Sequence, residues 1–447
     1  CTREAAQQVA AATLPILASL IDKSLLRKSP QTPTRYTMHE LVRQYAAEQL
    51  DSVPDALAQS VVAAHAAYYH GVVREAERQI WGANIADAVR RLEAENDNLR
   101  AALTHYLAEP AAVAQSIDLA GLLWRFWEIR GYIAEGRTWL TQALQRQMEL
   151  PPPSRWLALH GAGNLASDQG EYAIARAHYQ ECLQLLQTQL PTPTDAKASL
   201  RTRYRIATTL TNLGNCALRE GKLTEALAFS EEALMLQRQL AREPNQSGLN
   251  HDIGIAITTT NLATIKLLQQ EVEQAAQFAE ESLARYRALG DERGMGWNLS
   301  TLGAVAQARG QYAQAATLYA EARLLFEKLG AQADMVNLYF NLGELARVQG
   351  VYVQAESHYQ AGLTLAQGLG SKSEMALLLD RLSLVACQAG HYEQAVNWRD
   401  QSIALYRELH NRFGLREALQ HRGDIAAALG DQKSADSDDS QSRQYNA

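Results

Sequence analysis

A spacing of glycine residues, repeated along most of the chain, constrains the fold more than any other feature of the sequence. In its complete form, Gly303 is followed seven residues later by Gly310, and then by Tyr312 and Ala315. The pattern recurs, complete or with substitutions, in six segments that begin at Gly163, Gly214, Ala263, Gly303, Gly343 and Ser383. Such repetition predicts similar structural units stacked in a row, each contacting its neighbours.

The same spacing predicts the structure of one unit. The first glycine allows two helices to approach closely, and the second ends the first helix, because glycine adopts the left-handed conformation without a Cβ penalty. The aromatic residue and the alanine then open a second, antiparallel helix, along which Leu318, Leu325 and Leu329 form an apolar stripe. One such hairpin cannot bury its own apolar face, so we expect neighbouring hairpins to pack together.

These motifs resemble the tetratricopeptide repeat (TPR), in which Leu-Gly, Gly-x-Tyr, Ala and a final aromatic residue recur. The final aromatic position holds Tyr179, Tyr319 and Tyr359, whereas Ser230, Ala279 and Arg399 depart from the pattern. Gly310, Gly350, Gly390 and Gly430 follow one another at 40-residue steps. The TPR usually spans about 34 residues, so we expect longer helices, of the kind seen in kinesin light chains and bacterial signalling ATPases. The resemblance implies an all-α, right-handed superhelix (an α-solenoid).

The first 50 residues follow another pattern. A helix is predicted over residues 14–22, two short strands over 24–28 and 35–39 around a Pro-rich turn, and a second helix over 40–50. Residues 20–26 and 35–46 resemble the end of the winged helix of STAND ATPases, the signal-transduction ATPases whose motif there is Met-His-Asp. Met38 and His39 match that motif, and Glu40 stands where Asp is usual. The resemblance implies that His39 senses the ADP phosphate in the intact protein.

Together these patterns divide the chain into four parts. Residues 1–50 are predicted to be the C-terminal part of a winged-helix domain, and 51–115 a helical arm or linker. Residues 116–430 are predicted to be a TPR superhelix of about seven repeats, and 431–447 a polar capping helix or tail. Pro-Thr-Pro-Thr at 191–194 and Pro-Asn-Gln-Ser-Gly at 244–248 indicate longer connections within the array. We expect the chain to be a piece of a longer protein.

The sequence offers little for chemistry of its own. It has no Gly-x-x-x-x-Gly-Lys-Ser/Thr phosphate loop, no Cys-x-x-Cys or His-x-x-x-His pair, and dispersed histidines. We therefore expect no enzyme activity, no metal and no cofactor in this chain, while ATP or ADP with Mg²⁺ belongs to the intact protein.

Charge and hydropathy limit the classes of partner and the cellular location that we expect for this chain. A net charge of -7 gives no broad basic field, so nucleic acid is not an expected partner. A winged helix can also bind DNA, but only its end is present here, flanked by acidic residues. No apolar run approaches the roughly 20 residues that a membrane span needs. We expect a cytoplasmic protein.

The inner surface of the superhelix is the candidate partner-binding groove. In the TPR pattern, positions two, five, nine and twelve or thirteen of each first helix face it. These positions hold His160, Asn164, Asn215, Arg219, Trp297, Phe340, Glu344, Arg347 and Asp380. Trp297, Phe340 and Arg347 are predicted to converge on one patch of the residue types that dominate interface energy. Trp124, Arg125, Trp127 and Arg130 form a second candidate patch, for which packing against the winged helix is the favoured role.

The favoured function is an inducer-sensing domain of a STAND ATPase. It would couple binding of an inducer (protein, peptide or small molecule) in the TPR superhelix to ATP-dependent activation and oligomerisation, with the protein's own nucleotide-binding domain as a further partner. The alternative is a constitutive TPR scaffold for protein–protein interaction with no switch.

Overall fold

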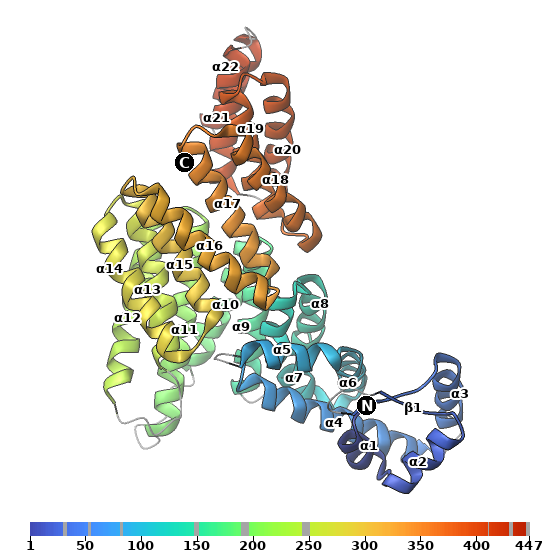
Figure 1. The fold of residues 1–447 in the computed structure, drawn as a ribbon. Coiled ribbons are helices and arrows are strands. Elements are labelled where there is room, and N and C mark those ends of the chain that lie inside the picture. Colours follow the sequence, from blue (N-terminus) through green and yellow to red (C-terminus); the bar gives the residue numbers. More distant parts are fainter. Residues whose placement is uncertain are drawn as a thin grey trace. The chain divides into compact units, whose positions relative to one another are not determined.

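The computed structural model describes residues 1–29, 34–51, 55–80, 84–146, 152–188, 196–243, 251–409, 411–428 and 432–443 (Figure 1). These residues form two compact units. The N-terminal unit contains residues 1–123 and 141–155, and the repeat unit contains residues 124–140 and 156–447. Helices α7 (Val113–Arg130) and α8 (Ile133–Leu144) each contribute residues to both units.

The N-terminal unit contains the predicted order of a helix, two strands and a helix, preceded by one further helix. After α1 (Arg3–Ala10), α2 spans Leu14–Asp22, the bounds expected from the sequence. The strands β1 (Arg27–Lys28) and β2 (Tyr36–Thr37) are shorter than expected and pair antiparallel, with Lys28 opposite Tyr36. Then α3 spans Glu40–Asp51. The predicted Pro-rich turn lies partly outside the described residues.

Leu17, Leu26 and Tyr36 form the small core beneath this hairpin. Arg35 holds β2 to α5 by donating to the Glu95 carboxylate at 2.5 Å and to the Ala94 carbonyl at 2.9 Å. The remaining elements of the unit are α4 (Asp55–Glu77), α5 (Ile85–Ala94), α6 (Asn96–Ala108) and a 3₁₀ turn, η1 (Pro110–Ala112).

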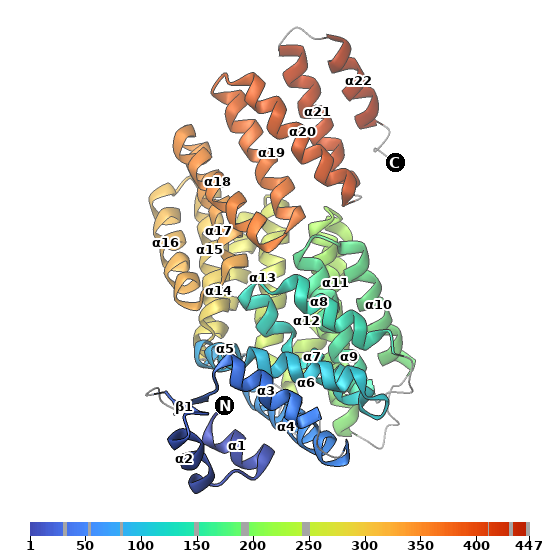
Figure 2. The ribbon, with the colours of Figure 1, turned by 90° about the vertical axis from the view of Figure 1, so that its right-hand side faces the viewer.

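The repeat unit is a stack of helical hairpins (Figure 2). The first helices of the hairpins are α9 (Pro152–Asp168), α11 (Ala196–Arg219), α13 (His251–Leu268), α15 (Glu292–Ala308), α17 (Gln332–Val348), α19 (Lys372–Gln388) and α21 (Arg412–Ala428). The second helices are α10 (Tyr172–Thr188), α12 (Leu223–Arg242), α14 (Val272–Leu289), α16 (Tyr312–Leu329), α18 (Tyr352–Leu369), α20 (Tyr392–Glu408) and α22 (Gln432–Arg443). The two expected long connections, at 191–194 and 244–248, lie outside the described residues, as does Gly430.

The first glycine of the pattern brings two helices together as predicted. A Cβ added to Gly343 on α17 would lie 2.2 Å from the ring of Tyr359 on α18. Gly163 with Tyr179 and Gly303 with Tyr319 repeat the arrangement, each at 2.5 Å. All three tyrosine rings are buried. The final aromatic residue of the TPR pattern therefore fills the space that the missing side chain leaves.

The second glycine ends the first helix in a left-handed conformation. Gly310, Gly350 and Gly390 have φ of 76°, 76° and 81°, a region that L-residues with a Cβ rarely adopt. In the weakest of the six segments Gln270 takes this place with φ of 63°. The turn is thus retained without glycine, at a cost in backbone strain.

The first helices form the inner layer of the stack. Successive first helices, such as α11 with α13 and α13 with α15, approach one another more closely than successive second helices do. A curved stack has its closer-spaced layer inside, because the inner path is shorter.

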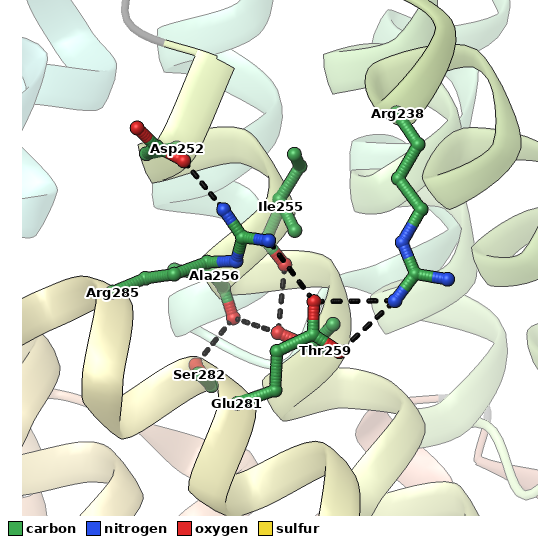
Figure 3. Close-up of polar contacts among 8 residues, drawn as sticks. All are labelled: Arg238, Asp252, Ile255, Ala256, Thr259, Glu281, Ser282 and Arg285. Atoms are coloured by element: carbon green, nitrogen blue, oxygen red, sulfur yellow. Dashed lines mark hydrogen bonds and ion pairs between the residues drawn. The ribbon is translucent and has the colours of Figure 1, made fainter. Parts of the chain in front are cut away.

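Ion pairs join consecutive hairpins on the second-helix side. Figure 3 shows one such group, in which Arg238 on α12 donates to Glu281 on α14 at 2.9 Å, and Arg285 links Glu281 to Asp252. Beneath it, the Thr259 and Ser282 hydroxyls donate to backbone carbonyls of α13. Exposed pairs of this kind contribute little individually, about 0–1 kcal/mol, but they add polar contacts between neighbouring hairpins.

Within the part of the chain that the structure describes, no single helix is both long and apolar enough to cross a bilayer. Only α1 and α2 taken together, bent by 110°, reach that length and composition.

Candidate binding surface on the first helices

Asparagine recurs at one position of the first helices, two residues before the first glycine of the pattern. We call Asn212 on α11, Asn261 on α13 and Asn341 on α17 the asparagine row. All three side chains are half-buried. Asn261 and Asn341 make no side-chain hydrogen bond to the described residues, so each carboxamide keeps two donors and an acceptor for another molecule.

A polar cluster surrounds His160 at the start of the row. His160 stacks on Trp156 with ring centroids 5.0 Å apart. Its Nε2 atom lies 3.2 Å from Asn164 Nδ2, and its Nδ1 atom lies 3.2 Å from Asn212 Nδ2. Tyr179 donates to Asn164 Oδ1 at 2.5 Å. Burial lowers the pKa of His160 to about 4, so the ring is neutral near pH 7. His160 was expected on the groove surface but is only 6% exposed.

A charged cluster lies on α17, α18 and α19. We call it the Phe340 cluster, and it consists of Phe340, Glu344, Arg347, Tyr359 and Arg381. Glu344 accepts hydrogen bonds from Tyr359 at 2.5 Å and from Arg347 at 2.8 Å. Arg381 lies 3.6 Å from the same carboxylate, with its guanidinium 5.8 Å from the Phe340 ring centroid. Burial alone would raise the pKa of Glu344, but Arg347 and Arg381 with Tyr359 outweigh it and lower that pKa. The structure thus brings three of the predicted residues, Phe340, Glu344 and Arg347, into one cluster.

Trp297 belongs to a different group. Its Nε1 donates to Asp334 at 2.9 Å, and the Arg293 guanidinium lies 4.8 Å from its ring centroid. Arg293 is buried and also donates to Glu128 at 3.0 Å. Trp297 is therefore held by a buried ion-pair network, and no described contact joins it to the Phe340 cluster as the predicted patch required.

Asp380 also differs from the expectation. Its side chain lies between α19 and α20, where it pairs with the buried guanidinium of Arg399. Arg399 occupies the position that Tyr319 and Tyr359 fill in other repeats, so a carboxylate beneath it neutralises a charge that burial would otherwise leave unpaired. Asp380 pairs with Arg399 inside the hairpin, so it does not belong to the candidate binding surface.

The remaining predicted groove residues lie on α11. Asn215 is half-buried on the same helix as Asn212. Arg219 is exposed near the end of that helix, with its guanidinium 4.0 Å from Glu374 of α19.

The ends of α7 and α9 and the start of α10 contact the beginnings of the later first helices α15 and α19, and we call these the closing contacts. The Ser371 hydroxyl at the start of α19 donates to the Asp168 carbonyl at the end of α9, at 2.7 Å. Tyr172 and Ser373 approach at 3.2 Å between their hydroxyl oxygens. The Arg293–Glu128 bond joins α15 to the end of α7. The Ser371–Asp168 and Arg293–Glu128 contacts each set the negative end of one helix dipole against the positive end of another.

A buried carboxyl group lies among the closing contacts. The Asp168 Oδ2 atom is buried and has no hydrogen-bond partner in the ranges that the structure describes. Burial, followed by the negative charge of Glu128, raises the pKa of Asp168 well above its usual range.

Two aromatic residues of the second candidate patch pack inside the repeat unit. Trp124 is buried, and a Cβ on Gly161 of α9 would lie 2.6 Å from it. Trp127 is buried against Gly136 of α8 in the same way. These contacts differ from the favoured packing against the winged helix.

His39 precedes α3 with an exposed side chain, and its Nδ1 accepts a hydrogen bond from the Leu41 amide at 3.3 Å. Across the described ranges, no group of three or more His, Cys, Asp or Glu side chains is placed to hold a metal ion.

Position six of the repeat, which holds the asparagine row, was missed by the sequence reasoning, which used positions two, five, nine and twelve or thirteen. A signal was present, since Asn recurs two residues before Gly214, Ala263 and Gly343. Position five is the one that the structure turns inward at His160 and Asp380.

Comparison with known proteins identifies the repeats. A family model described as tetratricopeptide repeat matches residues 254–328 and 334–408, and a second model with that description matches 157–188. The all-α TPR superhelix predicted from the sequence is confirmed.

The curated relatives share a shorter stretch. HTH-type transcriptional regulators of Mycobacterium bovis and Mycobacterium tuberculosis are 33% identical over 132 residues, which cover 29% of this chain. The match spans 14% of the length of those relatives.

Among solved structures, a Rap protein complexed with competence and sporulation factor has a TM-score of 0.55 at 13% identity. The match covers 87% of this chain and 98% of that one. A STAND protein with a tetratricopeptide repeat sensor from Pyrococcus horikoshii has a TM-score of 0.46 at 13% identity, over 99% of this chain and 60% of that one. At such identities the Rap likeness concerns the fold alone.

Proposed function

We propose that the first-helix face of the repeat unit binds an extended segment of a partner protein through the asparagine row. The unpartnered carboxamides of Asn261 and Asn341 are the observation that carries this proposal. A carboxamide offers a donor and an acceptor together, which matches the N–H and C=O of a peptide backbone. Because the side chains are already half-buried, binding removes little further water from them.

The flanking clusters support an extended ligand. The His160 cluster lies beside Asn212, and the Phe340 cluster includes residues of α17, the helix that carries Asn341. Both clusters combine aromatic rings with hydrogen-bonding groups, the composition found at interface hot spots. A segment crossing α11, α13, α15 and α17 would meet Asn212, Asn261 and Asn341 in turn, with Thr301 at the same position of α15.

Exchange of the asparagines tests this proposal. Asn261→Ala and Asn341→Ala should each weaken capture of pooled synthetic decapeptides by the immobilised chain. The expected loss is about 1 kcal/mol per residue, or roughly fivefold. Asn397→Ala, an exposed asparagine on the second helix α20, is the matched control and should bind as wild type. Wild-type capture by the double variant would contradict the proposal.

We further propose that this binding is the inducer-sensing step of a STAND ATPase. The Met38-His39 motif in its helix–strand–strand–helix setting supports the assignment. In this proposal the chain has no enzyme activity and no cofactor of its own, ATP or ADP with Mg²⁺ is bound by the intact protein, and the setting is cytoplasmic. Binding shifts the switch only if the active state holds the partner more tightly than the resting state does.

The alternative is a constitutive scaffold, and His39 separates the two. In the intact protein, His39→Ala should speed ADP release and raise basal activity. His391→Ala, on an exposed turn of the repeat unit, serves as control. Unchanged ADP retention in His39→Ala would remove the sensor role and favour the scaffold.

A further inference from the structure

A line of polar residues on α11 leads from the asparagine row to two arginines. Arg201, Arg205, Thr208 and Asn212 follow one another at steps of four, three and four residues, so they share one face of the helix. Arg205 is half-buried, and its guanidinium carbon lies 5.4 Å from the centroid of the Trp156 ring on α9. This is a cation–π arrangement that fixes the plane and position of the charge.

Arg205 has no acceptor among the residues that the structure describes. No hydrogen bond or ion pair is made by its guanidinium to the described residues. Burial, and then the nearby positive charge of Arg201, lower its pKa. Elsewhere on the first helices, the half-buried or buried Arg293, Arg347 and Arg381 each face a carboxylate. Arg205 is therefore half-buried with unused N–H donors, whereas the other three arginines are each neutralised by a carboxylate.

A second donor in the same cluster is also unsatisfied. The Nε1 atom of Trp156 is buried and finds no hydrogen-bond partner within the described part of the chain. Indole and guanidinium groups are donors only, so neither can satisfy the other. Leaving buried donors without an acceptor costs free energy that an incoming anion would recover.

We infer that Arg205, stacked on Trp156, binds a carboxylate of the partner segment, with Arg201 as a second cation. This inference rests on the proposed function, because a segment lying on Asn212 reaches Arg205 two turns along the same helix. The planar guanidinium binds a carboxylate through two parallel hydrogen bonds. The carboxylate belongs either to an Asp or Glu side chain or to the C-terminus of the segment.

Four pools of random decapeptides form the test, made with or without Asp and Glu and with a free or an amidated C-terminus. Capture of each pool by the immobilised chain is compared for wild type, Arg205→Met and the control Arg287→Met, an exposed arginine on α14. Methionine keeps an apolar stem against the Trp156 ring and removes the charge. Wild type and Arg287→Met should retain pools that carry a carboxylate about tenfold more strongly than the amidated pool without acids. In Arg205→Met this preference should disappear.

The pools also identify the source of the carboxylate. Preference for Asp and Glu in amidated pools assigns a side chain, and preference for a free C-terminus in pools without acids assigns the terminal carboxyl. If Arg205→Met melts well below wild type, Arg205→Lys replaces it, and the preference should then fall severalfold because the two-pronged geometry is lost. Equal capture of all pools by wild type would overturn the inference and leave peptide binding intact. Capture of none would overturn the proposed function as well.

Discussion

Arg399 places its buried guanidinium against Asp380, 19 residues earlier in the same hairpin, at the position where other repeats carry a tyrosine. The guanidinium also donates to the Ser383 hydroxyl at 3.2 Å. Ser383 itself replaces the glycine that receives the tyrosine ring in those repeats. The two departures from the TPR pattern, Ser383 and Arg399, therefore act together, and with Asp380 they form a polar triad in place of a glycine–tyrosine contact.

This triad predicts the effect of Asp380→Ala. Removing one partner of a buried ion pair costs about 3–5 kcal/mol, because the other charge is left unpaired. Asp380→Ala should destabilise the C-terminal hairpins by that order in chemical denaturation, and Asp380→Ala with Arg399→Leu should recover most of the loss. If Asp380→Ala were as stable as wild type but failed to capture peptides, Asp380 would belong to the binding surface after all.

The glycine–tyrosine contact predicts a second pair of variants. Gly343→Ala puts a Cβ within 2.2 Å of the Tyr359 ring, whereas Gly368→Ala meets nothing within 4 Å. Overpacking of this kind costs about 1–3 kcal/mol. Gly343→Ala should thus lower the melting temperature, and Gly368→Ala should leave it unchanged or raise it, since alanine favours helix. Equal melting of the two variants would show that α17 and α18 separate readily.

The closing contacts are tested through Glu128. In Glu128→Ala, Arg293 keeps Asp334 but loses its partner at the end of α7. Hydrogen exchange of the amides around residues 128–131 and 291–294 should then accelerate at least about tenfold, since 1.4 kcal/mol corresponds to that factor. Glu292→Ala breaks only an exposed pair with Lys328 and should leave those amides unchanged. Unaltered exchange in Glu128→Ala would mean that the bond does not hold the two helices together.

His160 gives the fold a predicted pH dependence. Its pKa falls to about 4 on folding, from an ordinary value of 6.5, because burial disfavours the charged ring. Between these two values the unfolded chain binds the proton and the folded chain does not, so stability is full above pH 6.5 and decreases as the pH falls toward 4. The loss amounts to about 3 kcal/mol. His160→Gln should flatten the melting temperature over this range, while the exposed His391→Gln should retain the wild-type slope. A slope that persists in His160→Gln would assign the effect to other groups.

Much of the fold follows from local sequence patterns. The 40-residue step reappears in the helices, since α15, α17 and α19 begin at Glu292, Gln332 and Lys372. Glycine at a helix end and glycine opposite a ring are constraints on the backbone itself, so they are visible without knowledge of the neighbours.

The side chains of the candidate binding surface were harder to place from the sequence. Positions five and six of a first helix differ by about 100° around its axis, and the exposed face begins between them. Which of the two positions is buried depends on how closely the next hairpin packs, and the type of residue at either position does not determine that packing. The surroundings of Trp297 could not be predicted for a related reason, because its partner Asp334 lies on α17 and its partner Arg293 is held by Glu128 of α7. Such contacts over 165 residues have no local signal.

An open solenoid behaves as a one-dimensional chain, in which each unit is stabilised by its two nearest neighbours and melting can advance from either end. In this repeat unit the closing contacts add interactions between hairpins that are not nearest neighbours along the chain. The hydrogen bond between Ser371 and Asp168 joins residues 203 positions apart. It therefore links the first and last of the hairpins that lie between α9 and α19. Truncation before α19 would then remove a neighbour from α9 as well as from α18. Unfolding of the repeat unit should accordingly be more cooperative than that of an open array of equal length.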